Sequence, residues 1–174
     1  MPEYDDRALF EKIILDGFQA GLSWRTILYK RDNFRKAFDG FAPEKIARYT
    51  PKKIERLMND AGIIRSKLKI NATVSNAQIY LDIMETEPEG FTGFLWDFVD
   101  GKPIINKIKD YREHMVKSPE SEAMAKELKR RGFKFCGPVI IYAFMQAVGM
   151  VNDHVVGCYR YKELARAPRR RTKR

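Results

Sequence analysis

Residues 126–158 read KELKRRGFKFCGPVIIYAFMQAVGMVNDHVVGC, and this stretch predicts two helices joined by a tight hairpin. We expect Gly132 to end the first helix and Gly137-Pro138 to begin the second, since proline suits the first helical position. A loop that leads into a helix N-terminus points backbone N–H groups outward, where they can hold a phosphate. The stretch therefore indicates a DNA-binding clamp at about 126–150, although an αα-hairpin with a basic rim would give the same pattern.

Positive charge is concentrated at the end of the chain. The formal net charge is +10, and residues 159–174, with eight Lys or Arg and one Glu, carry +7 of it. We expect residues 1–158 to form a single domain and residues 159–174 a flexible basic tail. Such a tail either binds polyanions without specificity or is a solvated terminus with no role.

Length and composition narrow the class of protein. A chain of 174 residues with 44% hydrophobic residues and eleven Phe is expected to form one packed globular core. No apolar run approaches the roughly 18 residues that a membrane span requires, and the start MPEYDD does not resemble a signal peptide. Two cysteines do not make a disulfide framework, so we expect a reduced, cytoplasmic compartment.

Helical spacing dominates the rest of the chain, and the predicted fold class is an all-α bundle, possibly with two lobes around a cleft. Gly17 and Gly21 are expected to frame a break, and residues 100–117 lack periodicity and are expected to form a loop. The expected helix starts are at Asp5 or Asp6, Ser23, Pro43, Thr50-Pro51, Ser66, Thr92 and Ser118-Pro119.

Three stretches together carry a family resemblance. They are Leu15-Asp16-Gly17 with Gln19–Trp24, Asp60–Arg65 with Lys69 and Asn76-Ala77, and Lys129–Gly137 continuing through Phe144–Ala147 to Val151–Cys158. Together they resemble the bacterial 3-methyladenine DNA glycosylase I family, the Tag branch of the helix-hairpin-helix superfamily, over about residues 2 to 160. The resemblance implies removal of 3-methyladenine from alkylated DNA in base excision repair.

One departure from the family lies at the N-terminus. Members normally begin with about twenty further residues that supply a pocket tyrosine and two zinc ligands, and this chain starts where that segment would end. The resemblance assigns the other two zinc ligands to His154 and Cys158, so we expect only half of a zinc site. If residues 154–158 are helical, the spacing of four puts both side chains on one face. A buried, metal-free pair is the alternative.

The base pocket is expected around the first two helices. The resemblance places Trp24 as the aromatic plate under a cationic base and Asp16 as the carboxylate near its exchangeable hydrogens, with Gln19 as a further hydrogen-bonding group. Family members usually have Glu in place of Asp16, so the shorter arm is expected to affect rate or base range. Without the family, Trp24 would be a core aromatic and Asp16 a solvated charge.

Contacts to DNA are expected on two loops. By resemblance Gly21 and Leu22 probe the gap that an everted nucleotide leaves, and an apolar wedge can replace the lost stacking. The alternative for Leu22 is a buried residue beneath Trp24. Phosphate contacts are assigned to the hairpin and to two cations that could equally be solvated surface; these residues are Phe133, Lys134, Phe135, Gly137, Arg65 and Lys69.

Catalysis is expected to need no cofactor, because the positive charge on 3-methyladenine already weakens the bond to the sugar. Asp16 and Asn152 are the candidate catalytic residues. Asn152 is the closest counterpart of the Asp that other members of the superfamily use, and we expect its loss to cost less than tenfold in rate. The partner is alkylated double-stranded DNA, bound by a cytoplasmic, nucleoid-associated monomer.

Two other functions fit the same residues. The first is a non-catalytic DNA- or damage-binding module that keeps the clamp but has lost the pocket. The second is a glycosylase with a different base preference.

Overall fold

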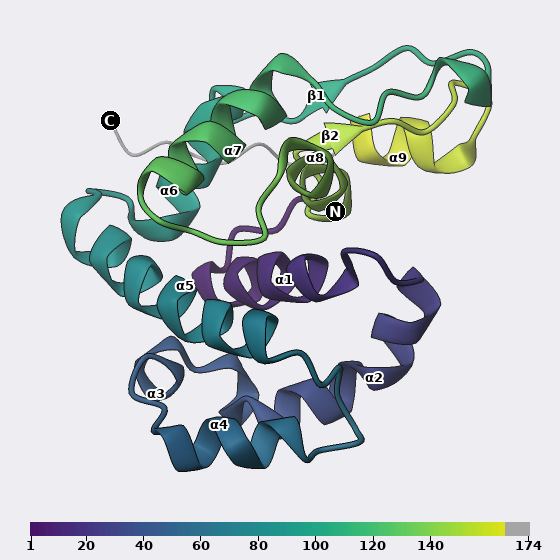
Figure 1. Ribbon diagram of the computed structural model, residues 1–174. Coiled ribbons are helices and arrows are strands. Elements are labelled where there is room, and N and C mark those ends of the chain that lie inside the picture. The colour runs from purple at the N-terminus through teal and green to yellow at the C-terminus, as the bar shows by residue number, and fades with distance from the viewer. Residues whose placement is uncertain (166–174) are drawn as a thin grey trace.

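The computed structural model describes residues 1–165 and is almost entirely helical, as predicted (Figure 1). The α-helices are α1 (Asp6–Gln19), α2 (Trp24–Ala37), α3 (Pro43–Ile46), α4 (Pro51–Met58), α5 (Lys67–Thr86), α6 (Gly90–Trp96), α7 (Pro119–Arg130), α8 (Pro138–Ala147) and α9 (Tyr159–Ala165). Short 3-10 turns lie at Asp39–Phe41, Asp97–Val99 and Tyr111–Glu113, and the two strands are β1 (Ile104–Ile105) and β2 (Val151–Asn152).

Most of the predicted helix starts are confirmed by side-chain caps. The side-chain oxygens of Asp5, Ser23, Thr50, Ser66 and Ser118 each accept a hydrogen bond from a backbone N–H in the first turn of the helix that follows. These caps satisfy N–H groups that a helix leaves without intrahelical partners.

The expected start at Thr92 is wrong, because α6 already begins at Gly90. The backbone N–H of Thr92 donates to the Asp6 carboxylate at 2.6 Å, and its hydroxyl donates to the carbonyl of Tyr4 at 2.9 Å. Thr92 therefore joins α6 to the start of α1 instead of capping its own helix.

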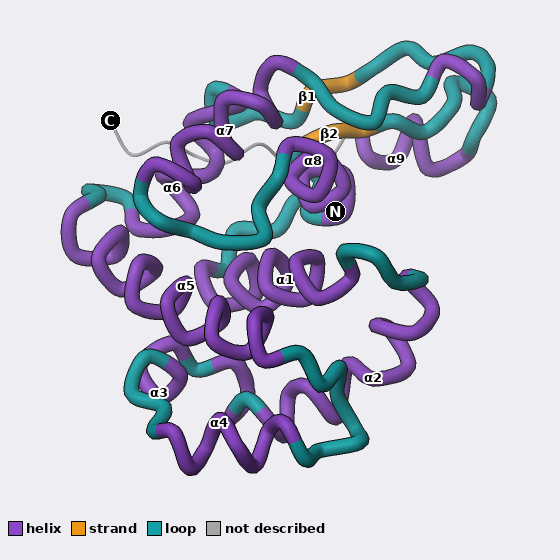
Figure 2. The backbone as a smooth tube through the Cα atoms, in the orientation of Figure 1, coloured by secondary structure: helices purple, strands orange, loops and turns teal. Residues whose placement is uncertain are grey.

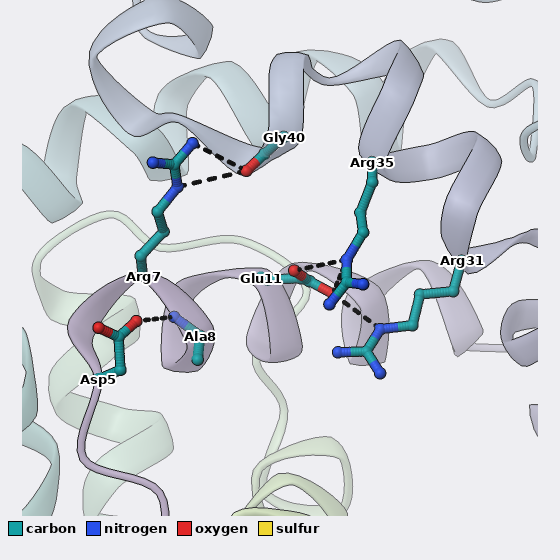
Figure 3. A network of polar contacts seen from close by, with 7 residues as sticks. All are labelled: Asp5, Arg7, Ala8, Glu11, Arg31, Arg35 and Gly40. Carbon is teal, nitrogen blue, oxygen red and sulfur yellow. Dashed lines mark hydrogen bonds and ion pairs between the residues drawn. The ribbon is translucent and has the colours of Figure 1, made fainter.

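Helix α1 lies in the middle of the molecule, between the α2–α5 layer and α8, as Figure 1 shows. Its buried apolar residues include Leu9, Phe10, Ile13 and Phe18. On another face, the buried Glu11 carboxylate accepts from Arg31 at 2.8 Å and from Arg35 at 2.9 Å (Figure 3). This pairing fixes α1 against α2, the two helices that carry Asp16 and Trp24.

The expected break at Gly17 is wrong, because α1 continues through it to Gln19. A Cβ at Gly17 would lie 3.2 Å from the Cβ of Phe135 and 3.3 Å from its carbonyl oxygen. Glycine is needed here for close approach of another segment and not for a turn. The break is confirmed at Gly21, whose φ of 81° lies in the left-handed region.

Residues 100–117 form mainly loop, as expected, but they also contribute β1. This strand pairs in parallel with β2, with Ile104 opposite Val151 and Ile105 opposite Asn152 (Figure 2). Two residues per strand are too few to show the alternation by which strands are recognised in sequences. The pair holds the 100–117 loop beside the segment that follows α8.

The predicted boundary at residue 159 is too early, since Tyr159–Ala165 form α9. The rest of the predicted basic tail, residues 166–174, lies outside the described residues. Within residues 1–165, no helix is both long and apolar enough to span a membrane.

Candidate base pocket and nucleic-acid interface

The predicted hairpin is present between α7 and α8. Gly132 adopts a φ of 97°, and the N–H of Phe133 closes the turn on the carbonyl of Leu128 at 2.9 Å. Gly137 precedes Pro138 at the first position of α8. Phe135 lies at the tip with a φ of 57° and is 37% exposed. Its conformation turns the backbone so that α8 starts at the surface, where its N-terminus can face a phosphate.

Two of the predicted hairpin amides are engaged within the protein. The N–H of Lys134 donates to the side-chain oxygen of Asn76 at 2.9 Å, and the Asn76 amide donates back to the carbonyl of Lys134 at 3.0 Å. The N–H of Phe133 is used in the turn, and its ring is buried. Backbone contacts to phosphate are therefore not expected from Phe133 or Lys134, which corrects the prediction and leaves Phe135 and Gly137 as the candidates.

Lysine side chains supply the free positive charge near the hairpin. Arg130 and Arg131 pair with Glu127, and Arg131 also pairs with Glu87. A groove of 1130 Å³ runs between α5, α7 and the hairpin. The lysines that line it are Lys126, Lys129 and Lys134, all exposed. The groove also has apolar walls and one acidic residue, Glu122, and its three lysines supply positive charge that can attract a phosphate chain.

The loop between α1 and α2 presents Leu22 to solvent. Leu22 is 38% exposed, so it is not the buried residue beneath Trp24 that the alternative required. The Gln19 side chain donates to the carbonyl of Leu22 at 2.7 Å, and the N–H of Leu22 donates to the carbonyl of Gln19 at 2.7 Å. Gln19 thus holds the loop, and its amide nitrogen is directed to backbone instead of to a pocket.

The two predicted phosphate-binding cations differ in their surroundings. Arg65 is exposed just before α5 and forms no ion pair with the described residues. The Lys69 ammonium donates to the carbonyls of Phe18 at 2.9 Å and Ala20 at 2.7 Å, and it lies 5.8 Å from the centre of the Phe135 ring. Lys69 therefore caps the C-terminus of α1 and connects the Leu22 loop to the hairpin.

Trp24 opens onto a pocket of 580 Å³. The pocket lies at the junction of α1, α2, α8, β2 and α9, and Lys12, Gln146 and Asp153 are among its polar lining residues. His114 and His154 also line it, and its apolar walls are formed by Leu28, Ala143, Ala147, Val151 and Leu164. This volume is ample for a purine, and apolar walls with few polar groups are typical of small-molecule sites.

Asp16 is not among the residues that line this pocket, but it forms an ion pair with Lys12, which is. Its side chain is 1% exposed and forms an ion pair with Lys12, while its second oxygen, Oδ2, makes no hydrogen bond to the described residues. Burial raises the pKa of Asp16 to about 6, against the opposing effect of Lys12. Burial likewise lowers the pKa of Lys12, although the carboxylate opposes that shift. Asp16 is thus a desolvated carboxylate, not the solvated charge of the alternative.

Asn152 is buried and both ends of its amide are engaged. Its nitrogen donates to the carbonyl of Tyr161 at 3.1 Å, and its oxygen accepts from the N–H of His154 at 3.2 Å. It fastens β2 to α9 and is absent from the lining of the pocket. The neighbouring Asp153 does line the pocket and accepts hydrogen bonds from Asn106, Tyr142 and Gln146.

A turn and not a helix brings His154 and Cys158 together, and the alternative of a buried pair is wrong, because His154 is exposed and Cys158 is only partly buried. The distance from His154 Nδ1 to Cys158 Sγ is 3.9 Å. A single metal could touch both atoms, but a tetrahedral zinc needs four ligands. Among residues 1–165 no three His, Cys, Asp or Glu side chains gather in a way that could hold a metal. The donor set of the described residues therefore does not fit a zinc site.

Sequence reasoning missed Lys12 as a site residue and, for Asn76, missed the contact with the hairpin. Lys12 precedes Asp16 by one helical turn, so the spacing of four was a visible signal for their ion pair. Asn76 is 58 residues from Lys134, and nothing in the local sequence connects them. The family motif contains Asn76, but it does not show which residue the side chain contacts.

A helical fold that combines a basic hairpin, an exposed apolar loop and a purine-sized pocket with a carboxylate defines a DNA-binding protein that can take up a single base. The methyladenine glycosylase family model matches residues 1–161, and the chain belongs to that family.

Two curated relatives and one solved structure support the assignment. The chain is 49% identical to the DNA-3-methyladenine glycosylase 1 of Escherichia coli, over 92% of this chain and 86% of the relative. It is 48% identical to the DNA-3-methyladenine glycosylase of Haemophilus influenzae, over 90% and 84%. A structure of 3-methyladenine DNA glycosylase I from Staphylococcus aureus, which describes recognition of 3-methyladenine, is 38% identical with a TM-score of 0.88 and covers 91% of this chain and 84% of that one.

Proposed function

We propose that this chain hydrolyses the N-glycosidic bond of 3-methyladenine in alkylated double-stranded DNA and that the pocket beside Trp24 receives the base. The observation that carries the proposal is that Lys12 lines the pocket together with Trp24, lies over the Trp24 ring and forms an ion pair with Asp16. The relatives named for 3-methyladenine support the choice of base. A base inside a duplex is inaccessible, so the nucleotide has to leave the stack first.

The reaction does not require an acid catalyst. In DNA, 3-methyladenine is cationic, and cleavage of its bond to C1′ returns the electron pair to the ring and releases a neutral base. Water adds to C1′ and loses a proton, which leaves an abasic sugar. The aromatic face of Trp24 can stack on the cationic ring, and the ionised Asp16 can attract its charge. These contacts hold the everted base in the pocket while the bond breaks.

The hairpin and the Leu22 loop are proposed to act on the DNA on either side of the pocket. The N–H groups of Phe135 and Gly137, with the Lys134 and Arg65 side chains, contact the phosphate chain without reading sequence. Leu22 enters the space that the everted nucleotide leaves and substitutes for its stacking, and Gly21 gives its loop the turn that exposes it.

Neither a cofactor nor the Asn152 side chain is proposed to take part in the reaction. Asn152 is occupied by Tyr161 and His154, so it has no free group to present to a sugar. We propose that His154 and Cys158 form a metal-free pair, and metal analysis of the purified protein tests this. One zinc per chain would contradict it.

The cellular setting is also proposed. The enzyme acts in the cytoplasm, at the nucleoid, as a monomer of one domain, since the pocket and the DNA-contacting loops come from one chain. Sedimentation of the protein at micromolar concentration tests the monomer. A stable dimer would contradict it.

The decisive experiment for the function measures bases released from methylated duplex DNA. We expect the protein to release 3-methyladenine in preference to 7-methylguanine, and Trp24→Ala to lose at least a hundredfold of the rate. Tyr29→Ala is the matched control, because Tyr29 lies on the same helix and is 74% exposed. DNA binding without release would favour the damage-binding module, and release of other bases would favour a glycosylase with another preference.

A further inference from the structure

Lys12 occupies the position in which the proposed function requires a cationic base. Its ammonium lies 4.2 Å from the centre of the Trp24 ring and forms an ion pair with Asp16. The aromatic face and the carboxylate are the two groups that would attract methylated adenine, and the same cation engages both. The Lys12 side chain is only 22% exposed, so this position is partly withdrawn from solvent.

We propose that Lys12 is a specificity-determining residue that acts as an internal cation in the base pocket and has to move away before a cationic base can enter. The inference rests on the proposed function, since it assumes that the base binds beside Trp24. Lys12 touches the groups that bind the base, and it acts on selectivity by competing for them.

The surroundings of Lys12 allow such a movement. Its side chain is a flexible arm of four methylene groups, and it lines a pocket of 580 Å³. Asp153 lines the same pocket, and although its carboxylate accepts hydrogen bonds from neighbouring side chains, its negative charge can attract a displaced ammonium. Arg31, on the facing helix, adds a repulsive positive charge that helps to lower the pKa of Lys12. The ion pair with Asp16 therefore holds the lysine in place, and the surrounding charges offer it another position.

Charge decides which ligands Lys12 disfavours. Binding of a cationic base costs the free energy of displacing the lysine and also the repulsion from the like charge that stays nearby. Binding of a neutral base costs only the free energy of displacing the lysine. Removing the charge of Lys12 should therefore improve the binding of a cation more than that of a neutral analogue.

The test compares two probes that differ in charge. The first is the 3,9-dimethyladeninium cation, in which a methyl group at N9 stands for the sugar and keeps the ring charged. The second is free 3-methyladenine at pH 8, which is neutral. Binding is followed by quenching of Trp24 fluorescence, because the other tryptophan, Trp96, is fully buried. The variants are Lys12→Met, which keeps length without charge, and Lys12→Gln, which also keeps a hydrogen-bond donor for Asp16.

We expect both variants to bind the cation at least tenfold more tightly than the parent and the neutral base less than threefold more tightly. Lys36→Met, in the last turn of α2, is the exposed control and should change neither. Thermal unfolding establishes whether each variant is folded. If Lys12→Met does not fold, Lys12→Gln is used for the comparison.

Two results would overturn the role of Lys12. Equal cation affinity in parent and variants would show that the lysine does not compete, and weaker affinity in both variants would show that it contacts the base as a partner. Neither result would contradict the assignment of the pocket beside Trp24 as the base site, which is tested by the Trp24→Ala measurement. Conversely, normal excision by Trp24→Ala would overturn the pocket whatever the Lys12 variants do.

Discussion

Lys69 donates a hydrogen bond to the backbone carbonyl of Ala20 at 2.7 Å, which joins α5 to the loop that presents Leu22. The same ammonium lies 5.8 Å from the centre of the Phe135 ring. One lysine thus connects the loop proposed to enter the DNA with the hairpin proposed to grip it. Their relative position is maintained inside the protein before any DNA is bound.

Lys69→Met should therefore impair excision from duplex DNA more than it impairs binding of the free base in the pocket. The variant leaves the carbonyls of Phe18 and Ala20 without their donor, and we expect a stability loss of about 1 to 2 kcal/mol. We also expect at least a tenfold slower release of 3-methyladenine from duplex DNA, with unchanged quenching of Trp24 by the free base. Lys67→Met, exposed on the same helix, is the control. Normal excision by a folded Lys69→Met would show that the connection has no role.

Features of the fold that arise from neighbouring residues were predictable. A cap needs only a polar side chain and an N–H three residues on, so Ser23 and Ser118 were recognised from the sequence. Gly17 was misread because glycine can serve a turn or a close approach, and only Phe135, distant in sequence, decides between them. The same limit applies to the site.

Site residues were predictable in identity but not in their contacts. The family resemblance predicts Trp24 and Asp16, and in the structure one side chain, that of Lys12, contacts both of them. That Lys12 stands between them was not anticipated, although its spacing from Asp16 was visible. Lys69 is predicted to face phosphate because it is a basic residue on a helix. The carbonyls to which it donates lie 49 and 51 residues away, and nothing in the local sequence indicates them.

Leu22→Ala should slow excision from duplex DNA while leaving the fold almost unchanged. Leu22 is 38% exposed, so truncation should cost about 0.5 kcal/mol or less in unfolding free energy. Stacking that the side chain restores to the duplex would be lost, and the rate should fall about tenfold or more. The comparison is with single-stranded methylated DNA, on which the variant and the parent should act alike. A large stability loss with normal duplex activity would refute the wedge.

Asn76→Ala should weaken DNA binding through the hairpin. Asn76 is buried and makes two hydrogen bonds with the backbone of Lys134, so its removal leaves both groups unpaired. We expect a stability loss of about 2 to 3 kcal/mol and a several-fold weaker affinity for undamaged duplex DNA. Asn76→Asp provides a second test, because a carboxylate can accept from the Lys134 N–H but repels its carbonyl. Unchanged affinity in both folded variants would show that the hairpin is shaped without Asn76.

Asp16 should make excision depend on pH near 6. Burial raises the pKa of Asp16 to about 6, and only the ionised carboxylate can attract a cationic base. The rate of 3-methyladenine release should therefore fall as the pH drops through about 6. Asp16→Asn should be slow throughout and nearly flat over this range. A parent enzyme with full activity at pH 5 would contradict the assignment of Asp16.

The Asp16 carboxylate should also make the free energy of unfolding depend on pH. Its contribution should fall with rising pH, whereas that of an ion-paired surface Asp rises. Because its pKa is raised on folding, the folded chain binds a proton that the unfolded chain releases between about pH 4 and 6. The contribution of Asp16 to stability therefore declines as the pH rises through this window. Relative to the parent, Asp16→Asn should gain about 2 to 3 kcal/mol in unfolding free energy between pH 4 and 7. Urea unfolding at the two pH values measures it, and a difference that does not change would mean that Asp16 is better solvated than its burial indicates.

Asn152→Ala should separate a structural role from a catalytic one. The Asn152 amide holds the carbonyl of Tyr161 and the N–H of His154, so we expect a stability loss of about 2 to 3 kcal/mol. Excision by the folded fraction should stay within about tenfold of the parent, which corresponds to roughly 1.4 kcal/mol in activation free energy. Single-turnover rates at saturating enzyme, measured well below the melting temperature, keep the two effects apart. Asn152→Asp retains the acceptor for His154 and should lose less stability than the alanine variant. A thousandfold slower single turnover in both folded variants would contradict the structural role. It would mean that the Asn152 amide acts directly on the sugar, because loss of a support for α9 cannot by itself remove that much transition-state stabilisation.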